Sequence, residues 1–362
     1  MRRQVRWIHV LGVLLCGKLS IAGAAEQDQT RQQFLAMIDR PRVPLTARVE
    51  QHPSTNPADA AVIHFSYATD AEHRVPGIQL FPPKPPKGRM PVVIVLHGTG
   101  GTKESELPLM RELASAGFLA VAIDGPHHGE RTQAKKGAAE YNQAIFRTWQ
   151  ENGGNGPTTS LALYEHPFYY DTVWDVMRLV DYLDEDPAAD PARIGLIGIS
   201  KGGIETYLTA AVDPRIAVAI PCIGVQSFRW ALDNNDWQGR IGTIQSAFDD
   251  AAKAAGVPNP DSKFAQAFYD RVVPGIADRF DGPAMLPLIA PRPLMVINGD
   301  SDTHTPLPGV KLATDAAAQA YQAAGASDHF VVRIEEKTAH KVTAESQHTA
   351  VEWFVRWLKP KP

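Results

Sequence analysis

The segment Gly198–Gly203, GISKGG, constrains the fold of this chain more than any other segment. It directly follows the apolar run Ile194–Ile197. A serine between glycines after such a run is typical of a strand that turns sharply into a helix. Side chains at Gly198 and Gly202 would collide in so tight a turn, so we expect glycine to be required there. The segment therefore predicts a strand that ends at Ile199 and a helix that begins behind Ser200.

The rest of the chain alternates between apolar runs and amphipathic segments. Pro91–His97 is a continuous apolar run, as expected for a strand buried on both faces of a parallel sheet. Repeated strand-then-helix order predicts an α/β fold, with a mostly parallel central sheet and helices on both faces. Further strands are predicted at residues 61–65, 75–81, 118–124, 216–222, 293–298 and 330–334, and helices at 107–116, 169–183, 312–323 and 343–358.

Two segments, at about residues 130–165 and 224–290, interrupt this alternation. Both follow strand ends at the edge of the sheet where open α/β folds bind ligands. We predict that they are insertions forming a lid or a substrate wall, and we take Trp230 and Trp237 as candidate substrate-binding residues. The alternative is that their aromatic side chains are buried under helices.

The N-terminus has the layout of a secretory signal. Basic residues are followed by an apolar stretch from Trp7 to about Ile21 and then by small residues. We predict a signal peptide at residues 1–25, export to the periplasm or the medium, and a single domain over residues 26–362. Two alternatives remain: an uncleaved membrane anchor, which Lys18 disfavours, and a lipoprotein modified at Cys16.

Composition and the remaining motifs exclude several classes of protein. The formal net charge of −4 does not suit a nucleic-acid binder. There is no phosphate-binding loop, and the glycines after the strand at 91–97 lack dinucleotide-binding spacing. His127 and His128 lack zinc-site spacing, so we interpret them as part of a structural turn. Without Cys16 only Cys222 remains, and we expect it to be a buried, inert thiol. The sequence predicts no metal and no cofactor.

If Ser200 is a nucleophile, it needs a base to take its proton and an acid to orient that base. In this type of fold the acid follows the nucleophile and the histidine comes last. The strand at 293–298 is followed by Asp300 and Asp302. We favour Asp302, because its distance from Pro306 leaves room for a turn that aims the carboxylate across the sheet.

Three histidines follow these aspartates. His329 precedes the last predicted strand, and His348 lies inside the last predicted helix. His340 falls in the loop between them, where the base is required, so we predict His340 as the base.

An oxyanion hole needs two backbone donors. The N–H of Lys201 is expected to supply one, and Gly98 or Thr99 the other, because the glycine-rich loop lets the backbone approach a substrate. We expect the side chain of Lys201 to be solvated at the start of its helix, where it could attract anionic substrates.

Taken together, these motifs resemble the α/β-hydrolase superfamily, and within it the dienelactone-hydrolase and acetyl-xylan-esterase type, also described as prolyl-oligopeptidase-like. The resemblance covers roughly residue 75 to the C-terminus. It rests on His97–Gly101, Gly198–Gly203, Gly299-x-x-Asp302-x-x-x-Pro306 and His340.

The resemblance implies an α/β-hydrolase fold and a metal-free, cofactor-free serine hydrolase that cleaves carboxylic esters through an acyl-enzyme. It assigns Ser200 as nucleophile, Asp302 as acid, His340 as base, and the amides of Thr99 and Lys201 as the oxyanion hole. The implied substrate is a small-molecule or polymer-linked ester, with no nucleic acid and no stable membrane association. The alternatives are a serine peptidase of the prolyl-oligopeptidase type and a non-catalytic binding protein with a hydrolase fold.

Overall fold

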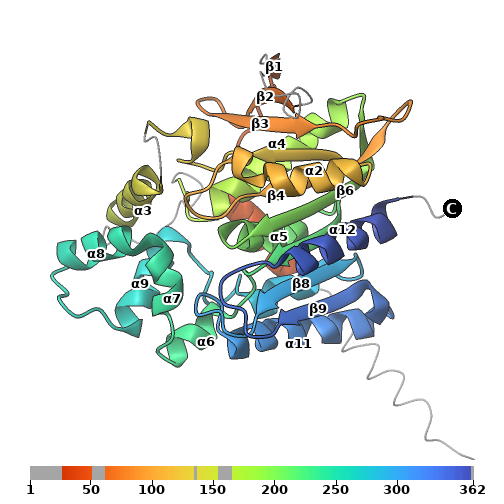
Figure 1. The fold of residues 1–362 in the computed structure, drawn as a ribbon. Helices are drawn as coiled ribbons and strands as arrows, with labels where there is room; N and C mark the ends of the chain where they lie inside the picture. The colour runs from red at the N-terminus through yellow and green to blue at the C-terminus, as the bar shows by residue number, and fades with distance from the viewer. Residues whose placement is uncertain (1–26, 51–61, 134–136, 154–164, 360–362) are drawn as a thin grey trace, which may run out of the picture.

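The computed structural model describes residues 27–50, 62–133, 137–153 and 165–359. The predicted signal peptide lies outside these residues. Within them, nine strands form one sheet in the order β1-β2-β3-β5-β4-β6-β7-β8-β9 (Figure 1). The strands are β1 (Arg48–Glu50), β2 (Val62–Ala68), β3 (Arg74–Leu80), β4 (Met90–Leu96), β5 (Leu119–Ile123), β6 (Ala189–Ile199), β7 (Ile216–Cys222), β8 (Leu294–Gly299) and β9 (Phe330–Glu335).

The sheet is mixed. β1 to β3 pair antiparallel, β3 pairs antiparallel with β5, and every pairing from β5 through β4 to β9 is parallel. The carboxyl ends of the parallel strands therefore meet at one edge of the sheet. In the register of β4 with β6, Leu96 lies opposite Gly198. This pairing places the loop after β4 beside Ser200.

Helices cover both faces of the sheet, as predicted for an α/β fold. Along β4 the side chains alternate: Val93 and Val95 belong to a core cluster with α2 and α12, whereas Val92 and Ile94 belong to one with α4, α5 and α11. This alternation explains why β4 reads as a continuous apolar run. The helices are α2 (Leu107–Ser115), α4 (Tyr170–Glu185), α5 (Lys201–Val212), α11 (Leu307–Ala323) and α12 (Ala344–Leu358).

The two predicted insertions pack against each other. Helix α3 (Ala139–Glu151), from the first insertion, contacts α8 and α9 of the second, and the N–H of Ala247 donates to Asn142 Oδ1 at 3.2 Å. These helices lie together at one side of the sheet (Figure 1). We call α3 and α6–α9 the helical lobe. Its other members are α6 (Phe228–Asp233), α7 (Gln238–Ile241), α8 (Gln245–Ala254) and α9 (Ser262–Val272), and α10 (Gly282–Met285) leads back to the sheet.

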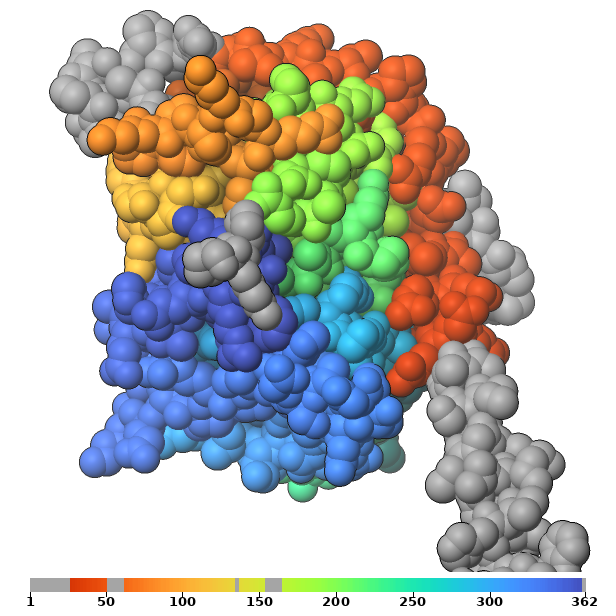
Figure 2. Space-filling view, turned by 90° about the vertical axis from the view of Figure 1, so that its right-hand side faces the viewer, coloured from red at the N-terminus to blue at the C-terminus, as the bar shows by residue number. Residues whose placement is uncertain are grey.

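The N-terminal segment packs against the outside of the domain and is hydrogen-bonded to it. Residues 27–38 are helical, and the red segment runs along one side of the molecule in Figure 2. The Arg31 side chain donates to the carbonyl oxygens of Ala211, at 3.0 Å, and Leu288, at 3.1 Å. Within the described residues there are also 3-10 turns at η1 (Lys103–Glu106), η2 (Gly129–Arg131), η4 (Gly242–Ile244), η5 (Leu286–Ile289) and η6 (Ser327–His329).

Helix α11 and strand β1 are two of the elements that differ from the sequence prediction. Helix α11 begins at Leu307, five residues before the expected start, because Pro308 in its first turn needs no hydrogen-bond donor there. Strand β1 was not predicted at all. Its three residues are exposed and carry no apolar alternation, so only pairing with β2 defines it as a strand.

Candidate functional site

The turn at Ser200 is as crowded as the glycine pattern predicts. A Cβ at Gly198 would lie 2.2 Å from the carbonyl oxygen of Gly202, and one at Gly202 would lie 2.4 Å from that of Leu96. Ser200 itself has φ 57° and ψ −110°, outside the regions that most residues adopt. Strained backbone of this kind is typical of functional sites. The turn raises the Ser200 hydroxyl above the end of β6.

The structure brings together Ser200, His340 and Asp302 from three separate loops. His340 Nε2 lies 2.7 Å from Ser200 Oγ, and His340 Nδ1 lies 2.8 Å from Asp302 Oδ2. Both distances are within the range that proton transfer requires. The Asp302 side chain is fully buried, whereas the His340 side chain is 24% exposed. The arrangement can move a proton from the serine hydroxyl onto a histidine that a buried carboxylate orients.

The carboxylate of Asp302 is held by several donors. Thr305 Oγ1 donates to Oδ2 at 2.7 Å, and the backbone N–H of His304 donates to Oδ1 at 2.8 Å. Burial alone would raise the pKa of Asp302, but its hydrogen bonds and the neighbouring imidazole of His340 outweigh burial and hold the pKa below its usual range. Asp302 is therefore ionised near neutral pH.

The other acid and base candidates lie elsewhere. Asp300 accepts from Ser301 Oγ at 2.7 Å and from the N–H of Thr338 at 3.2 Å, which are contacts of a turn. His329 Nδ1 lies 2.7 Å from the carbonyl oxygen of Pro291. His348 lies 3.1 Å from Glu112. None of these three candidates is hydrogen-bonded to Ser200 or Asp302.

Ser200 opens into a cavity of about 820 Å³, which we call the serine cavity. Both insertions contribute to its wall, through Gly137 and Ala138 of the first and Thr243 of the second. These residues place part of each insertion beside Ser200, as a substrate wall would require. The remaining lining residues are Gly98, Thr99, Gly100, Ser105, Glu106, Pro108, Leu109, Ile199, Ile223, His340, Lys341, Val342 and Gln347.

The two tryptophans proposed for substrate binding are not among these lining residues. Trp237 is 6% exposed and packs against Phe248, with ring centroids 5.4 Å apart. Trp230 is half-buried beside Gly309. The structure therefore gives no support to either tryptophan as a contact in the serine cavity, and Trp237 instead contributes to the core of the helical lobe.

His97 fixes the glycine-rich loop, a role that the sequence reasoning missed. The N–H of Gly125 donates to His97 Nε2 at 3.0 Å, so the ring proton is on Nδ1, which donates to the carbonyl oxygen of Gly98 at 2.8 Å. Burial and the nearby charge of Lys201 lower the pKa of His97 to about 3. The neutral ring therefore holds Gly98 and Thr99 beside Ser200, where a Cβ at Gly98 would lie 3.6 Å from Ser200 Cβ. This placement suits the amide of Thr99 to an oxyanion hole.

The side chain of Lys201 is buried, contrary to expectation. It is 1% exposed and forms an ion pair with Glu205 at 2.5 Å. Its ammonium nitrogen lies 5.7 Å from the centre of the Tyr141 ring. Every residue of α5 is buried, so position 201 faces protein rather than solvent. The backbone N–H of Lys201 begins the helix as predicted, but its side chain cannot attract substrates from solution.

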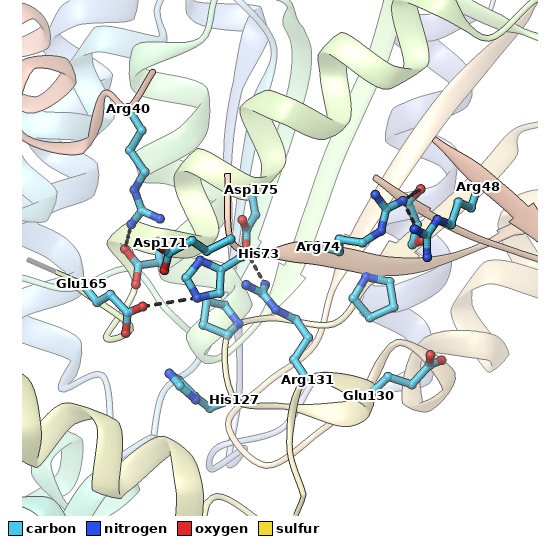
Figure 3. Close-up of a pocket in the computed structure, with 14 residues that line it drawn as sticks. Arg40, Arg48, His73, Arg74, His127, Glu130, Arg131, Glu165, Asp171 and Asp175 are labelled. Atoms are coloured by element: carbon cyan, nitrogen blue, oxygen red, sulfur yellow. Dashed lines mark hydrogen bonds and ion pairs between the residues drawn. The ribbon is translucent and has the colours of Figure 1, made fainter. Parts of the chain in front are cut away.

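A second cavity, of about 390 Å³, lies among charged side chains of β1, β3, α4 and the loop after β5 (Figure 3). We call it the charged cavity. Its charges pair with one another: Arg40 binds Asp171, and Arg131 binds Asp175. The lining residues are Arg40, Arg48, Ser66, Glu72, His73, Arg74, Pro76, Pro126, His127, Glu130, Arg131, Glu165, Asp171 and Asp175.

The remaining motifs take structural positions. His128 is buried, and its Nδ1 lies 2.7 Å from the carbonyl oxygen of Pro126, as expected for a turn. Cys222 is a buried free thiol whose pKa is raised by burial. Among the described residues, no helix combines the length and the apolar character needed to cross a membrane.

A protein-family profile matches more than half of the chain. The profile of the family described as "Glucuronyl esterase, fungi" matches residues 81–325. The "Putative hydrolase YtaP" of Bacillus subtilis (strain 168) is 27% identical over 291 residues, covering 76% of this chain and 81% of that protein. The "4-O-methyl-glucuronoyl methylesterase 1" of Sodiomyces alcalophilus is 30% identical over 161 residues, covering 43% of this chain and 31% of that protein.

Solved structures share the fold at low sequence identity. An acetyl xylan esterase from Paenibacillus sp. R4 aligns with a TM-score of 0.61 and 18% identity, over 91% of this chain and 94% of that chain. A glucuronoyl esterase from Solibacter usitatus aligns with a TM-score of 0.55 and 16% identity, over 90% of this chain and 91% of that chain. The predicted resemblance to α/β-hydrolases of the acetyl-xylan-esterase type is thereby confirmed for the fold.

Proposed function

The chain belongs to the glucuronyl esterase family, and from this premise we propose that it is a serine esterase acting on carboxylic esters carried by carbohydrates. The observation that carries the proposal is the hydrogen-bonded chain from Ser200 Oγ through His340 to Asp302. Ser200 and His340 line a cavity of about 820 Å³, so a substrate can reach the serine hydroxyl. Nucleophile, base and acid are the groups that acyl transfer requires.

In the proposed mechanism Ser200 Oγ attacks the ester carbonyl carbon while His340 Nε2 takes the hydroxyl proton. The amides of Thr99 and Lys201 stabilise the negative oxygen of the tetrahedral intermediate. His340 then gives its proton to the departing alcohol oxygen and leaves an acyl group on Ser200. Water, deprotonated by His340, releases the acid and restores the serine. Asp302 stays ionised and stabilises the imidazolium in both halves of the reaction.

The cavity wall supports a sugar-borne ester. Pro108, Leu109 and Val342 offer apolar surface, and Ser105, Glu106 and Gln347 offer polar groups on the same wall. A sugar ring presents apolar C–H faces and hydroxyl edges, so a wall of mixed character suits it better than it suits a long acyl chain. The proteins similar to this chain include ones named for acetyl xylan and for methyl-glucuronoyl esters.

A fluorophosphonate probe tests the nucleophile, with Ser200→Ala as the control. We expect the wild-type protein to be labelled and the variant to remain unlabelled. Absence of labelling in the wild type would favour a non-catalytic binding protein. Equal labelling of both would reject Ser200 as the nucleophile.

A substrate panel tests the reaction class. Acetylated xylo-oligosaccharides, methyl glucuronate esters and simple chromogenic acetates are compared with aminoacyl amides. We expect turnover of esters, with the carbohydrate esters giving the highest kcat/KM. Hydrolysis of amides alone would indicate a serine peptidase of the prolyl-oligopeptidase type.

Export is a second part of the proposal, and it rests on the sequence of residues 1–25. Mass spectrometry of the protein recovered from its producing cells tests this. We expect the mature chain to begin after the small residues that end the signal. An intact N-terminus would indicate a membrane anchor or a cytoplasmic protein, and a lipid on Cys16 would indicate a lipoprotein.

A further inference from the structure

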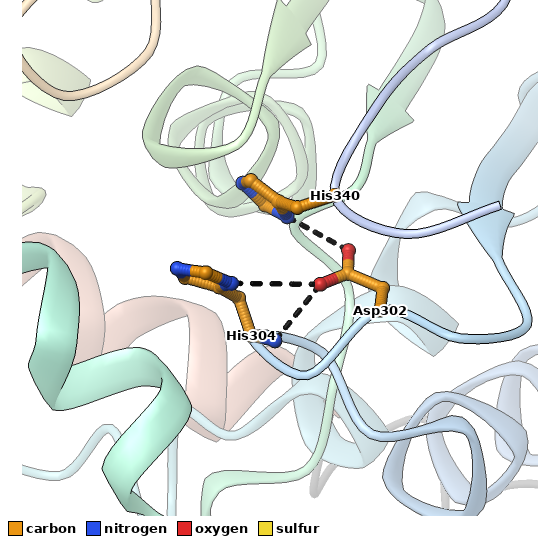
Figure 4. A group of neighbouring side chains, drawn as sticks. All are labelled: Asp302, His304 and His340. Atoms are coloured by element: carbon orange, nitrogen blue, oxygen red, sulfur yellow. Dashed lines mark hydrogen bonds and ion pairs between the residues drawn. The ribbon is translucent and has the colours of Figure 1, made fainter.

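His304 stands beside the proposed catalytic residues without a role in the mechanism. Its ring stacks on that of His340, with centroids 4.3 Å apart and an interplanar angle of 24° (Figure 4). Its Nδ1 lies 3.8 Å from Asp302 Oδ1. This nitrogen is buried and makes no hydrogen bond to the described residues. A buried imidazole nitrogen with unused bonding capacity, facing a carboxylate, needs an explanation.

Asp302, His304 and His340 each offer one ligand atom, and these atoms all lie within 4.8 Å of one another. Zn²⁺ binds imidazole nitrogen and carboxylate oxygen at about 2.0–2.2 Å, so two ligands of a tetrahedral site lie roughly 3.4 Å apart. Side-chain shifts of about 1 Å would therefore bring the three atoms into coordinating distance. The His304 side chain is 31% exposed and that of His340 is 24% exposed, so an ion can enter from solution.

We propose that Asp302, His304 and His340 form a binding site for a divalent transition-metal ion such as Zn²⁺, and that an ion bound there switches the esterase off. The inhibitory part of this inference rests on the proposed function of Ser200. Two imidazoles and one carboxylate are the donor set that Zn²⁺ prefers, and a fourth position remains for water.

A metal ion bound at this site would prevent catalysis, because it would be coordinated by atoms of His340 and Asp302 that the reaction uses. His340 Nδ1 faces Asp302 and carries the proton of their hydrogen bond. When the metal coordinates Nδ1, the neutral ring carries its proton on Nε2 instead, and metal–ligand bonds from His340 and Asp302 replace the hydrogen bond between them, so no electron pair remains on the ring to take the Ser200 proton. His340 can then no longer become the imidazolium that acyl transfer requires. Removal of the metal and return of the proton restore the base.

The second group of possible ligands described in the structure is a weaker candidate. It consists of His64, Glu104 and Glu130. Both glutamates are exposed and form ion pairs with Lys103, at 2.8 Å and 2.5 Å. A cation there would have to compete with an ammonium group already in place, whereas His304 Nδ1 has no competing partner of this kind.

The test is a Zn²⁺ titration of ester hydrolysis by the full-length protein in a buffer that does not chelate metals. We expect saturable inhibition that EDTA reverses, and no inhibition by Mg²⁺, which prefers oxygen ligands. His304→Phe keeps a ring for stacking and the backbone N–H for Asp302, but it removes both ligating nitrogens. Each variant is compared with its own metal-free rate. We expect His304→Phe to need at least about tenfold more Zn²⁺ for half inhibition, since one of three ligands is lost.

His348→Phe is the matched control, because His348 is an exposed histidine beside Glu112 and Glu352 on the surface. It should keep the wild-type response to Zn²⁺. Equal sensitivity of His304→Phe and the wild type would overturn the proposal, and so would a shift caused by His348→Phe alone.

Cobalt binding gives a readout that does not depend on activity. Tetrahedral Co²⁺ bound by nitrogen and oxygen absorbs visible light far more strongly than the hydrated ion. We expect these bands with the wild-type protein and not with His304→Phe. If the protein hydrolyses no ester, the proposed function fails while the cobalt spectra still decide whether the metal site exists. Identical spectra for the two proteins would reject the site.

Discussion

The serine cavity and the charged cavity show two opposite uses of polar side chains. In the charged cavity, cationic and anionic side chains form ion pairs: Arg131 pairs with Asp175, and Arg40 pairs with Asp171 (Figure 3). In the serine cavity, a single hydrogen-bonded chain ends at the Ser200 hydroxyl. The first arrangement leaves little bonding capacity for a ligand, and the second ends in a group that can react.

The comparison teaches that charge density by itself does not mark a binding site. Paired charges stabilise the positions of the segments that carry them, and a third partner would have to break an existing ion pair. In a reactive site, hydrogen bonds from neighbouring groups hold the polar side chains in position, as those from Thr305 and the His304 backbone N–H hold Asp302. Changes to Ser200, His340 or Asp302 should therefore affect rates, and changes to the ion pairs of the charged cavity should affect stability.

Replacement of the nucleophile gives the largest expected effect. Ser200→Ala should lower kcat for ester hydrolysis by a factor on the order of 10⁵, because no other group forms the acyl-enzyme. The melting temperature should not fall, since the strained turn loses only a hydroxyl. Steady-state kinetics with a carbohydrate ester and a thermal melt check both statements. Residual activity above a few per cent would mean that Ser200 is not the nucleophile.

Replacement of the acid should have the next largest effect. Asp302→Asn should lower kcat by about 10³- to 10⁴-fold, since an amide no longer stabilises the imidazolium of His340. Asp300→Asn is the matched control, because Asp300 makes only turn contacts with Ser301 and Thr338. It should stay within about threefold of the wild-type kcat/KM. A larger loss in Asp300→Asn than in Asp302→Asn would reverse the assignment.

His97 should affect the rate through the loop that it holds. His97→Gln loses the ring that joins Gly125 to Gly98 and should lower kcat by about 10- to 100-fold, with a smaller change in KM. Because the pKa of His97 is about 3, the wild-type pH profile near neutrality owes nothing to this residue. The variant should therefore keep the shape of that profile. A change in KM alone would show that His97 only shapes the binding surface.

Glu106 lines the serine cavity, and its ionisation should make the stability of the protein depend on pH. Burial raises its pKa from the ordinary value of 4.5 to about 7. The folded state therefore holds this proton more tightly than the unfolded state, so stability falls as pH rises from about 4.5 to about 7. Glu106→Gln should remove that loss, and its melting temperature relative to the wild type should increase between pH 5 and pH 8, to be measured by thermal melts.

Glu104→Gln is the control for this prediction. Glu104 lies on the same short helix, but its ion pair with Lys103 contributes to holding its pKa below the ordinary value although burial acts in the opposite direction. This variant should not gain stability relative to the wild type as the pH rises. If both variants respond alike, the effect belongs to the helix η1 and not to the carboxyl group of Glu106.

The charged cavity should show the smallest effect on catalysis. Arg131→Gln leaves the buried carboxylate of Asp175 without its cation and should lower the free energy of unfolding by about 3 kcal/mol. kcat/KM should stay within about threefold of wild type, measured well below the melting temperature. A selective loss of activity toward carbohydrate esters, with stability retained, would identify the charged cavity as a substrate subsite and contradict the comparison above.

The sequence predicted the parts of the site that depend on local geometry. Gly198 and Gly202 are required by backbone atoms within a few ångströms, so their spacing alone indicates the turn. The loop position of His340 follows from strand order, which apolar runs reveal. The sequence suggested Trp230 and Trp237 as substrate contacts although neither lines the serine cavity, because composition does not say whether an aromatic residue faces a cavity or the core of a lobe. The burial of Lys201 was missed because it depends on Glu205 and Tyr141 from two helices.

By itself the sequence determined the alternation of the main strands and helices, the sharp turn at Ser200 and the short list of acids and bases, because these follow from residue type and spacing. The tertiary structure decided which of them meet. Only the packed sheet places Asp302 rather than Asp300 against His340, closes the loop of His97 over the turn and stacks His304 beside the base. Hydrogen bonds of about 3 Å depend on the relative positions of loops far apart in the chain, and side-chain packing of the whole domain sets those positions.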